Sequence, residues 1–219
     1  LSMPPELRHG TNALGWCGRA VDSIADRLVF REFQEDNYEM MEIFQMNNPD
    51  TFFDNAILSA IISSCCFVYI SKDATGYPRL QVIDGSNATG ILDPITGMLT
   101  EGYAVLERDD NDNAVIEAYF IKGYTRIIRK GQNPRDYKNN APYPLLVPII
   151  YRPDAKRPFG HSRISRACMG IQDAAVRTVK RSEISAEFYS YPQKWVTGLS
   201  PEAEPVEKWK ATTSSMMTF

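Results

Sequence analysis

The chain has little of what most catalytic sites are built from. Its 219 residues include only two histidines, His9 and His161, and four cysteines whose spacing is not that of metal ligands. No Gly-x-Ser-x-Gly elbow, no Gly-x-x-x-x-Gly-Lys-Ser/Thr phosphate loop and no dinucleotide fingerprint occurs. We therefore predict no catalytic residue, no cofactor and no metal, and a protein that is not an enzyme.

Two weaker chemical signals have a plain structural interpretation. His161 precedes a long predicted helix, where its imidazole either satisfies the turn or transfers protons; we favour the turn. Asp109, Asn111 and Asn113 space their oxygens as the start of a calcium loop does. That loop would need a glycine at its sixth position and a glutamate at its twelfth, where Phe120 stands, so we predict no metal there.

Long apolar runs are also missing. No run approaches the roughly 18 residues that cross a bilayer, and the first ten residues lack a cationic stretch followed by an apolar one, so we expect neither a membrane span nor a signal peptide. Hydrophobic residues make up 43% of the chain and charged residues 23%, as in globular proteins of one or two domains. Cys65 and Cys66 would point to opposite faces of a strand and would not easily form a disulfide with each other. We therefore expect free thiols in a reducing compartment.

The first third of the chain has helical periodicity. Apolar residues recur at intervals of three and four from Leu14 to Leu28, behind a possible cap at Thr11 or Asn12. A second amphipathic run covers residues 35–46. Asn48-Pro49 is typical of a helix start, and we expect a third helix from there through Ile62.

The middle third has the alternation and composition of strands. Short β-branched or aromatic runs, divided by turn residues, predict strands at 66–71, 79–84, 102–108, 115–121 and 125–129. Residues 93–97 predict a turn, 109–113 a hairpin loop and 131–144 a surface loop. The fold class that follows is α+β: helices followed by a mainly antiparallel sheet, then one long helix.

That long helix is predicted over residues 163–190. Pro158 and Gly160 interrupt what precedes it, Ser162 is suited to cap its first turn, and Tyr191-Pro192 would end it. At about 1.5 Å per residue it would be roughly 43 Å long. One side carries no charge and is rich in small residues: Ile164, Ala167, Cys168, Ile171, Ala174, Ala175, Thr178, Val179, Ser182, Ala186 and Tyr189.

A separate stripe of the same helix is basic, and consists of Arg163, Arg166, Arg177, Lys180 and Arg181. Residues 151–194 hold nine Lys or Arg and four Asp or Glu, whereas the rest of the chain holds 15 and 23. Such a basic rod suits DNA phosphates or acidic residues of another copy. The neutral side either packs on its own domain or packs, on a projecting helix, against other copies of the chain.

Several segments resemble the phage portal proteins of the SPP1 type. The segments GHSRISRA, DAAVRT and SAEFYSYPQKWVTG are similar to the beginning, middle and end of that family's first stem helix. AVDSIADRL, from Ala20, is similar to an early helix that leads into a short strand, here Val29-Phe30. VPIIYRP, from Val147, is similar to the strand before the stem. The chain departs from the pattern at Ser64-Cys65-Cys66, where the family often has a glycine.

The resemblance implies the N-terminal portion of a portal subunit. Residues 1–157 would form the α+β wing, 158–191 the projecting stem helix, and 192–219 the start of a clip, with a second stem helix, a channel loop and a crown beyond it. It also implies a ring of about twelve copies at one capsid vertex of the virion, assembled in the cytoplasm of the bacterial host. Its partners would be double-stranded DNA in the channel, the terminase, head-completion proteins and the capsid, with no membrane.

Within that resemblance, the long helix supplies the predicted contact residues. We expect subunit packing through Ile164, Ala167, Cys168, Ile171, Ala175, Val179, Ser182 and Ala186. The basic stripe would face DNA or pair with a neighbouring subunit, and we favour pairing because a tight grip would hinder sliding. The alternative function is a monomeric α+β domain that binds nucleic acid or hydrolyses a substrate without a recognisable motif.

Overall fold

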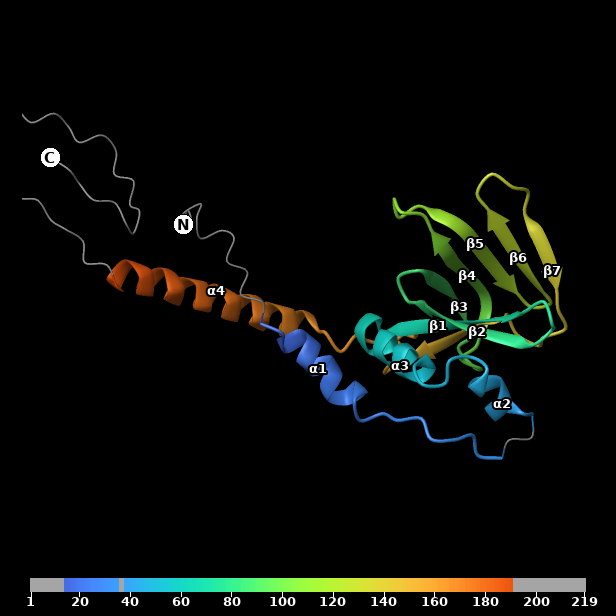
Figure 1. Ribbon diagram of the computed structural model, residues 1–219, viewed down its shortest axis with the longest axis horizontal. Helices are drawn as coiled ribbons and strands as arrows, with labels where there is room; N and C mark the ends of the chain where they lie inside the picture. The colour runs from blue at the N-terminus through green and yellow to red at the C-terminus, as the bar shows by residue number, and fades with distance from the viewer. Residues whose placement is uncertain (1–13, 36–37, 191–219) are drawn as a thin grey trace, which may run out of the picture. The chain divides into compact units, whose positions relative to one another are not determined.

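Figure 1 shows the computed structural model, which describes residues 14–35 and 38–190. The chain divides into a body, Cys17–Ser165, and a second unit to which the last described helix belongs. The predicted α+β class is confirmed. Three helices come first, eight strands follow and one long helix ends the described chain: α1 (Trp16–Ala25), α2 (Met40–Gln45), α3 (Phe52–Ser63) and α4 (Arg166–Ser190).

The strands form two antiparallel sheets where the sequence predicted one. A three-stranded sheet has the order β2-β1-β8, from Pro78–Asp84, Cys65–Lys72 and Leu146–Ile150. A five-stranded sheet has the order β3-β4-β5-β6-β7, from Ala88–Leu92, Leu99–Arg108, Ala114–Ile121, Tyr124–Arg129 and Arg135–Lys138. The five-stranded sheet is therefore inserted in the chain between β2 and β8.

The main core lies between the two sheets. Cys65 and Phe67 of β1 pack in one cluster with Leu99, Phe120 and Leu146, all at most 6% exposed. Since side chains alternate along a strand, Cys66 and Val68 of β1 face the other way. Cys66 packs with Ala56 and Ala60 of α3, which confirms the prediction that the two cysteines point apart.

Helix α3 and a cluster of phenylalanines cover that other face of the three-stranded sheet. α3 contacts all three strands of this sheet. Beside it, five aromatic rings pack in edge-to-face, tilted or stacked arrangements, with centroids 4.4–6.3 Å apart: Phe30, Phe33, Phe44, Phe52 and Phe53. The body thus has three layers, one of helices and two of strands.

The five predicted strands are confirmed within about three residues, as β1, β2, β4, β5 and β6. The prediction of a loop over 131–144 is wrong in part, because β7 lies within it. β3 was not predicted: two of its five residues, Ala88 and Gly90, have low strand propensity. Val29-Phe30 is not a strand in this structure; Phe30 instead joins the aromatic cluster.

Helix boundaries were predicted less well. α1 and α2 lie inside their predicted ranges, and the proposed caps Thr11 and Asn12 lie outside the described residues. α3 begins at Phe52 and not after Asn48, because Asn48 has a φ of 56°, in the left-handed region. A cap residue has extended backbone; the Asn48 side chain instead donates to the Thr51 hydroxyl over 2.7 Å.

Both predicted turns are confirmed. In 93–97 the Gly97 amide donates to the Asp93 carbonyl, and Gly97 has the positive φ, 69°, that this turn requires. The loop 109–113 joins β4 to β5 as a hairpin.

Candidate assembly surfaces

Helix α4 is 25 residues long and begins at Arg166, three residues later than predicted. At about 1.5 Å per residue its length is roughly 37 Å. It reaches Ser190, and the predicted end at Tyr191-Pro192 lies outside the described residues. Two residues of the predicted helix surfaces, Arg163 and Ile164, therefore belong to the segment that precedes the helix.

That segment is held by the C-terminal end of α3. The Arg163 amide donates to the Ile61 carbonyl over 2.9 Å, and the Ser162 hydroxyl donates to the Ile62 carbonyl over 2.5 Å. The last carbonyls of a helix have no partner within it. Residues about 100 positions later in the chain therefore supply hydrogen-bond donors for two of the last carbonyls of α3. Ser162 also accepts from the Ile164 amide over 3.0 Å. Ser162 thus stabilises a turn ahead of α4. The prediction that it caps the first turn of this helix is wrong.

The neutral side of α4 has no fully buried member. Ile171 is 62% exposed and Tyr189 is 89% exposed. The remaining members within the helix are half-buried or exposed: Ala167, Cys168, Ala174, Ala175, Thr178, Val179, Ser182 and Ala186. Their role in packing between subunits stays a prediction.

The basic stripe is divided between the helix and the segment before it. Arg166, Arg177 and Arg181 are exposed on α4, and Lys180 is half-buried. Arg163 lies in the body, where its Nε donates to the Ala20 carbonyl of α1 over 3.4 Å. Arg163 therefore contacts another element of the body, which sequence reasoning did not anticipate.

His161 stabilises a turn, which agrees with the favoured interpretation. Its Nε2 bonds to the Asp154 carboxylate, and its Nδ1 lies 3.0 Å from the Arg157 guanidinium. The hydrogen bond from His161 and the backbone amide of Arg157 lower the pKa of Asp154. Both ring nitrogens are engaged within residues 154–161.

The acidic loop between β4 and β5 is organised by its own hydrogen bonds. The Asp109 carboxylate accepts from the amides of Asn113, over 2.8 Å, and Asn111, over 3.0 Å, and lies 3.6 Å from the Lys130 ammonium. These contacts, the Asn113 amide first, lower the pKa of Asp109. Among the described residues, no group of three or more His, Cys, Asp or Glu is placed to hold a metal ion.

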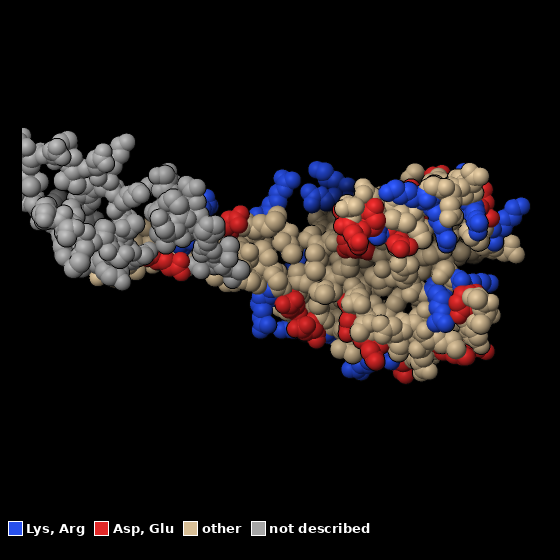
Figure 2. Space-filling view, turned by 45° about the horizontal axis from the view of Figure 1, so that its top comes forward, with Lys and Arg blue, Asp and Glu red and all other residues tan. Residues whose placement is uncertain are grey.

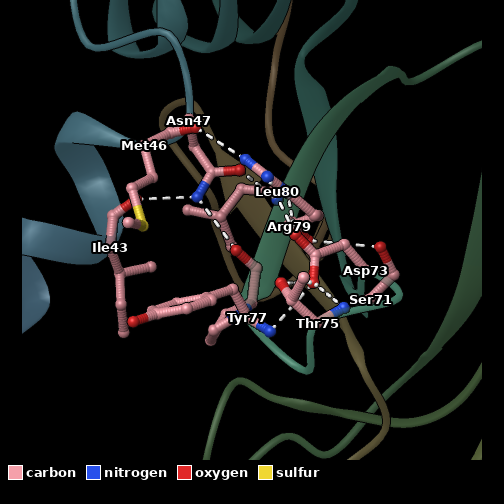
Figure 3. Close-up of polar contacts among 10 residues, drawn as sticks. Ile43, Met46, Asn47, Ser71, Asp73, Thr75, Tyr77, Arg79 and Leu80 are labelled. Atoms are coloured by element: carbon pink, nitrogen blue, oxygen red, sulfur yellow. Dashed lines mark hydrogen bonds and ion pairs between the residues drawn. The ribbon is translucent and has the colours of Figure 1, made fainter.

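A group of polar contacts around Asn47, here called the Asn47 cluster, fixes the segment between α2 and α3 to the three-stranded sheet (Figure 3). The Asn47 side chain is 9% exposed, and its Nδ2 donates to the carbonyls of Ile43, over 2.7 Å, and Pro78, over 3.1 Å. Its Oδ1 accepts from the Leu80 amide over 2.9 Å. Pro78 and Leu80 lie on β2, an edge strand, so the amide of Asn47 bonds to that edge as a further strand would.

An ion pair completes the Asn47 cluster. Arg79 Nη2 lies 2.8 Å from the Asp73 carboxylate, and Arg79 Nη1 donates to the Met46 carbonyl over 2.9 Å (Figure 3). Hydrogen bonds from the Thr75 hydroxyl and nearby amides lower the pKa of Asp73 to about 2. No sequence pattern indicated these contacts, because Asn48-Pro49 indicated only a helix start.

A second polar cluster joins α3 to the turn after β2. The Asp84 carboxylate accepts from the hydroxyls of Ser59 and Ser86, each over 2.6 Å, and of Ser63 over 3.0 Å. Burial raises the pKa of Asp84, but these hydrogen bonds outweigh it, and the net pKa is lowered. Sequence reasoning missed this cluster because its members lie up to 27 residues apart.

No family model matches this chain. The portal protein of Mycobacterium phage L5 is 24% identical over 223 aligned residues, which cover 92% of this chain and 45% of that protein. The chain is therefore distantly similar to a phage portal protein. It spans less than half of that relative's length.

Within the described ranges, none of the helices is both long and apolar enough to span a lipid bilayer.

Proposed function

We propose that this chain is the N-terminal part of a phage portal subunit, a structural protein without enzymatic activity. The observation that carries the proposal is the similarity to the L5 portal protein over 92% of the chain. The order of elements supports it, because helices, an antiparallel body and one long helix follow one another as the resemblance implies.

The proposed mechanism is geometric. Residues 1–157 serve as the wing, which spaces neighbouring subunits, and 158–191 as the stem helix, which aligns with its copies around a channel. Residues 192–219 begin the clip, where terminase and head-completion proteins dock. About twelve copies form the ring at one capsid vertex of the virion, through which DNA is packaged and ejected.

The neutral side of α4 supplies the physical support for stem packing. Small side chains such as Ala167, Ala175 and Ala186 let helix backbones approach closely. None of them is fully buried within the chain, so a neighbouring copy has room to cover them. We propose that the basic stripe of Arg166, Arg177, Lys180 and Arg181, with Arg163 before the helix, pairs with acidic groups of that neighbour in preference to DNA.

A single substitution tests the stem. Ala175→Arg in the complete portal protein places a long cation on the neutral side, and we expect rings in native mass spectrometry to be replaced by monomers while the far-UV circular dichroism is unchanged. Asp173→Arg is the matched control, because a residue two positions away lies about 200° around the helix. Rings of normal size from Ala175→Arg would contradict stem packing through this side.

The same measurement bears on the alternative function. A wild-type protein that stays monomeric at every concentration and binds nucleic acid as a monomer would favour a nucleic-acid-binding domain over a portal subunit.

A further inference from the structure

Two segments of the body carry opposite charge. Residues 32–54 contain seven Asp or Glu and no Lys or Arg, whereas residues 122–138 contain six Lys or Arg and one Asp. The first segment includes α2 and the start of α3, and the second includes β6 and β7. Charges separated in this way give the body an acidic surface and a basic one.

The acidic surface follows from the aromatic cluster. Phe33, Phe44 and Phe52 pack inward against the three-stranded sheet, and the described charged residues of this segment are exposed. The acidic surface consists of exposed carboxylates: Glu32, Glu35, Glu39, Glu42, Asp50 and Asp54. No salt bridge involves any of them among residues 14–35 and 38–190.

The basic surface lies at the free edge of the five-stranded sheet. β7 is the last strand of that sheet and pairs with β6 alone. Two cations of this hairpin are paired locally, Arg126 with Asp136 over 2.7 Å and Lys130 with Asp109 over 3.6 Å. The basic edge consists of the other four, all exposed: Lys122, Arg129, Arg135 and Lys138.

The two surfaces belong to different layers of the body. The acidic surface lies on the helical layer and the basic edge on the five-stranded sheet, with the three-stranded sheet between these layers (Figure 1). Figure 2 shows several Lys and Arg side chains, with Asp and Glu side chains among them, at the right-hand end of the body, the end at which Figure 1 places β6 and β7. One copy is therefore able to present both surfaces to two different neighbours.

Each surface also carries an exposed tyrosine among its charges. Tyr38 of the acidic surface is 82% exposed, and Tyr137 of the basic edge is 49% exposed. Aromatic residues surrounded by charged groups are typical of protein–protein interfaces, because the ring supplies buried area and the charges supply orientation.

We propose that the acidic surface of one copy binds the basic edge of the next. The contact joins two unlike surfaces, so it repeats from copy to copy in one direction, as a ring requires. The occupant of each surface is a second copy of this chain, because the complementary charge is present on the same body. This inference rests on the proposed portal function and names the body surfaces through which neighbours meet.

Charge on an edge strand has a second known role, which is to prevent strands of other molecules from pairing with it. The two roles give opposite results when the charge is changed. If Arg135 and Lys138 only protect the edge, altering them leaves self-association unchanged or increases it. If they bind a neighbour, reversing their charge weakens self-association.

Sedimentation velocity on the 219-residue chain, up to about 1 mM, a concentration that detects even weak contacts, separates these outcomes. An edge variant, Arg135→Glu with Lys138→Glu, and a surface variant, Glu39→Lys with Glu42→Lys, are each compared with the wild type. A control with the same charge change as the edge variant, Arg19→Glu on α1 with Arg27→Glu in the turn after it, shows the effect of net charge. Circular dichroism confirms that each variant is folded.

We expect the wild type and the control to self-associate, and added salt to weaken this association because exposed charges are screened. Each variant alone should associate at least about tenfold more weakly, as expected from charges that oppose their partners. An equimolar mixture of the two variants should associate again, since the edge variant keeps its acidic surface and the surface variant keeps its basic edge.

Three results would overturn the proposal: a wild-type chain that stays monomeric, variants that associate as the wild type does, or a mixture that associates no better than its components. None of them decides the portal function, because that is judged from rings of the complete protein. If the complete protein carrying the edge variant formed rings at normal yield, the proposed role of these two surfaces would be refuted. The proposed portal function would stand.

Discussion

Asn47 shows how one polar side chain holds a helix against a sheet edge. Its amide group makes hydrogen bonds to Ile43, Pro78 and Leu80 in a site that is 9% exposed. A buried amide without its partners loses solvation and gains nothing in return, so these bonds also specify the position of α2 on β2.

Replacing Asn47 by alanine should therefore destabilise the body. Because the substitution leaves the Pro78 carbonyl and the Leu80 amide without this partner, we expect the free energy of unfolding to fall by about 1–3 kcal/mol. Urea denaturation followed by circular dichroism measures the change. Asn55→Ala is the control, since Asn55 is exposed on α3 and alanine favours a helix. Equal decreases in the free energy of unfolding from both variants would refute the stabilising role of the Asn47 cluster.

Asp84 gives a pH-dependent test at the same scale. Its pKa in the folded protein is lowered, against the effect of burial, by hydrogen bonds from Ser59, Ser86 and Ser63. A group with a depressed folded pKa stabilises the protein above its unfolded pKa, about 3.9 for Asp, and loses that contribution as the pH falls towards the folded pKa.

We expect Asp84→Asn to be less stable than the wild type at pH 7 and the difference to shrink as the pH is lowered below about 4. Chemical denaturation of both proteins at pH 7, 4 and 3 provides the comparison. Asp110→Asn, in the exposed hairpin loop, is the matched control. A difference for Asp84→Asn that is constant over this pH range would show that its charge does not contribute.

At the scale of elements, periodicity predicted most of the fold. The strands with clear alternation were found, and the short turns were found because Pro, Gly and Asp have specific backbone preferences. β7 was missed because three of its four residues are charged and all are exposed, so it has no apolar period. The division into two sheets was also missed, because β1 pairs with β8, about 80 residues further on, and no local pattern records such a pairing.

The start of α4 was misplaced for a related reason. Ser162 has the right identity for a cap, but its hydroxyl bonds to the α3 carbonyl of Ile62, a partner that only the tertiary structure supplies. Neither the neutral side nor the basic stripe of α4 is tested by the structure alone. Both rest on the spacing of residues along the helix.

Two glycines near this helix should respond oppositely to alanine. Gly160 has a φ of 78°, and an added Cβ would clash with the Tyr151 carbonyl, whereas Gly170 within α4 has no atom near the corresponding position. We expect Gly160→Ala to destabilise the protein by at least about 1 kcal/mol. Gly170→Ala should stabilise α4 by about 0.5–1 kcal/mol. Thermal unfolding of the pair measures both, and equal melting temperatures would contradict the backbone argument.

At the scale of the whole molecule, the sequence and the structure support different parts of the proposal. Order and spacing of motifs along the sequence indicated a portal subunit, and a distant portal protein of which the chain covers 45% agrees with that. The acidic surface and the basic edge emerge only from the structure, because the aromatic cluster decides which side of 32–54 is exposed and the sheet order decides that β7 is an edge.

The insertion of the five-stranded sheet between β2 and β8 has a consequence for synthesis of the chain. A ribosome releases β1 and β2 long before β8, so the flank of β1 that β8 will occupy has no strand beside it while more than 60 further residues are made. Pairing across such a separation is slow, because a long loop has to close first. We therefore expect the chain to be most prone to aggregation during synthesis while the β1–β2 hairpin is present without β8.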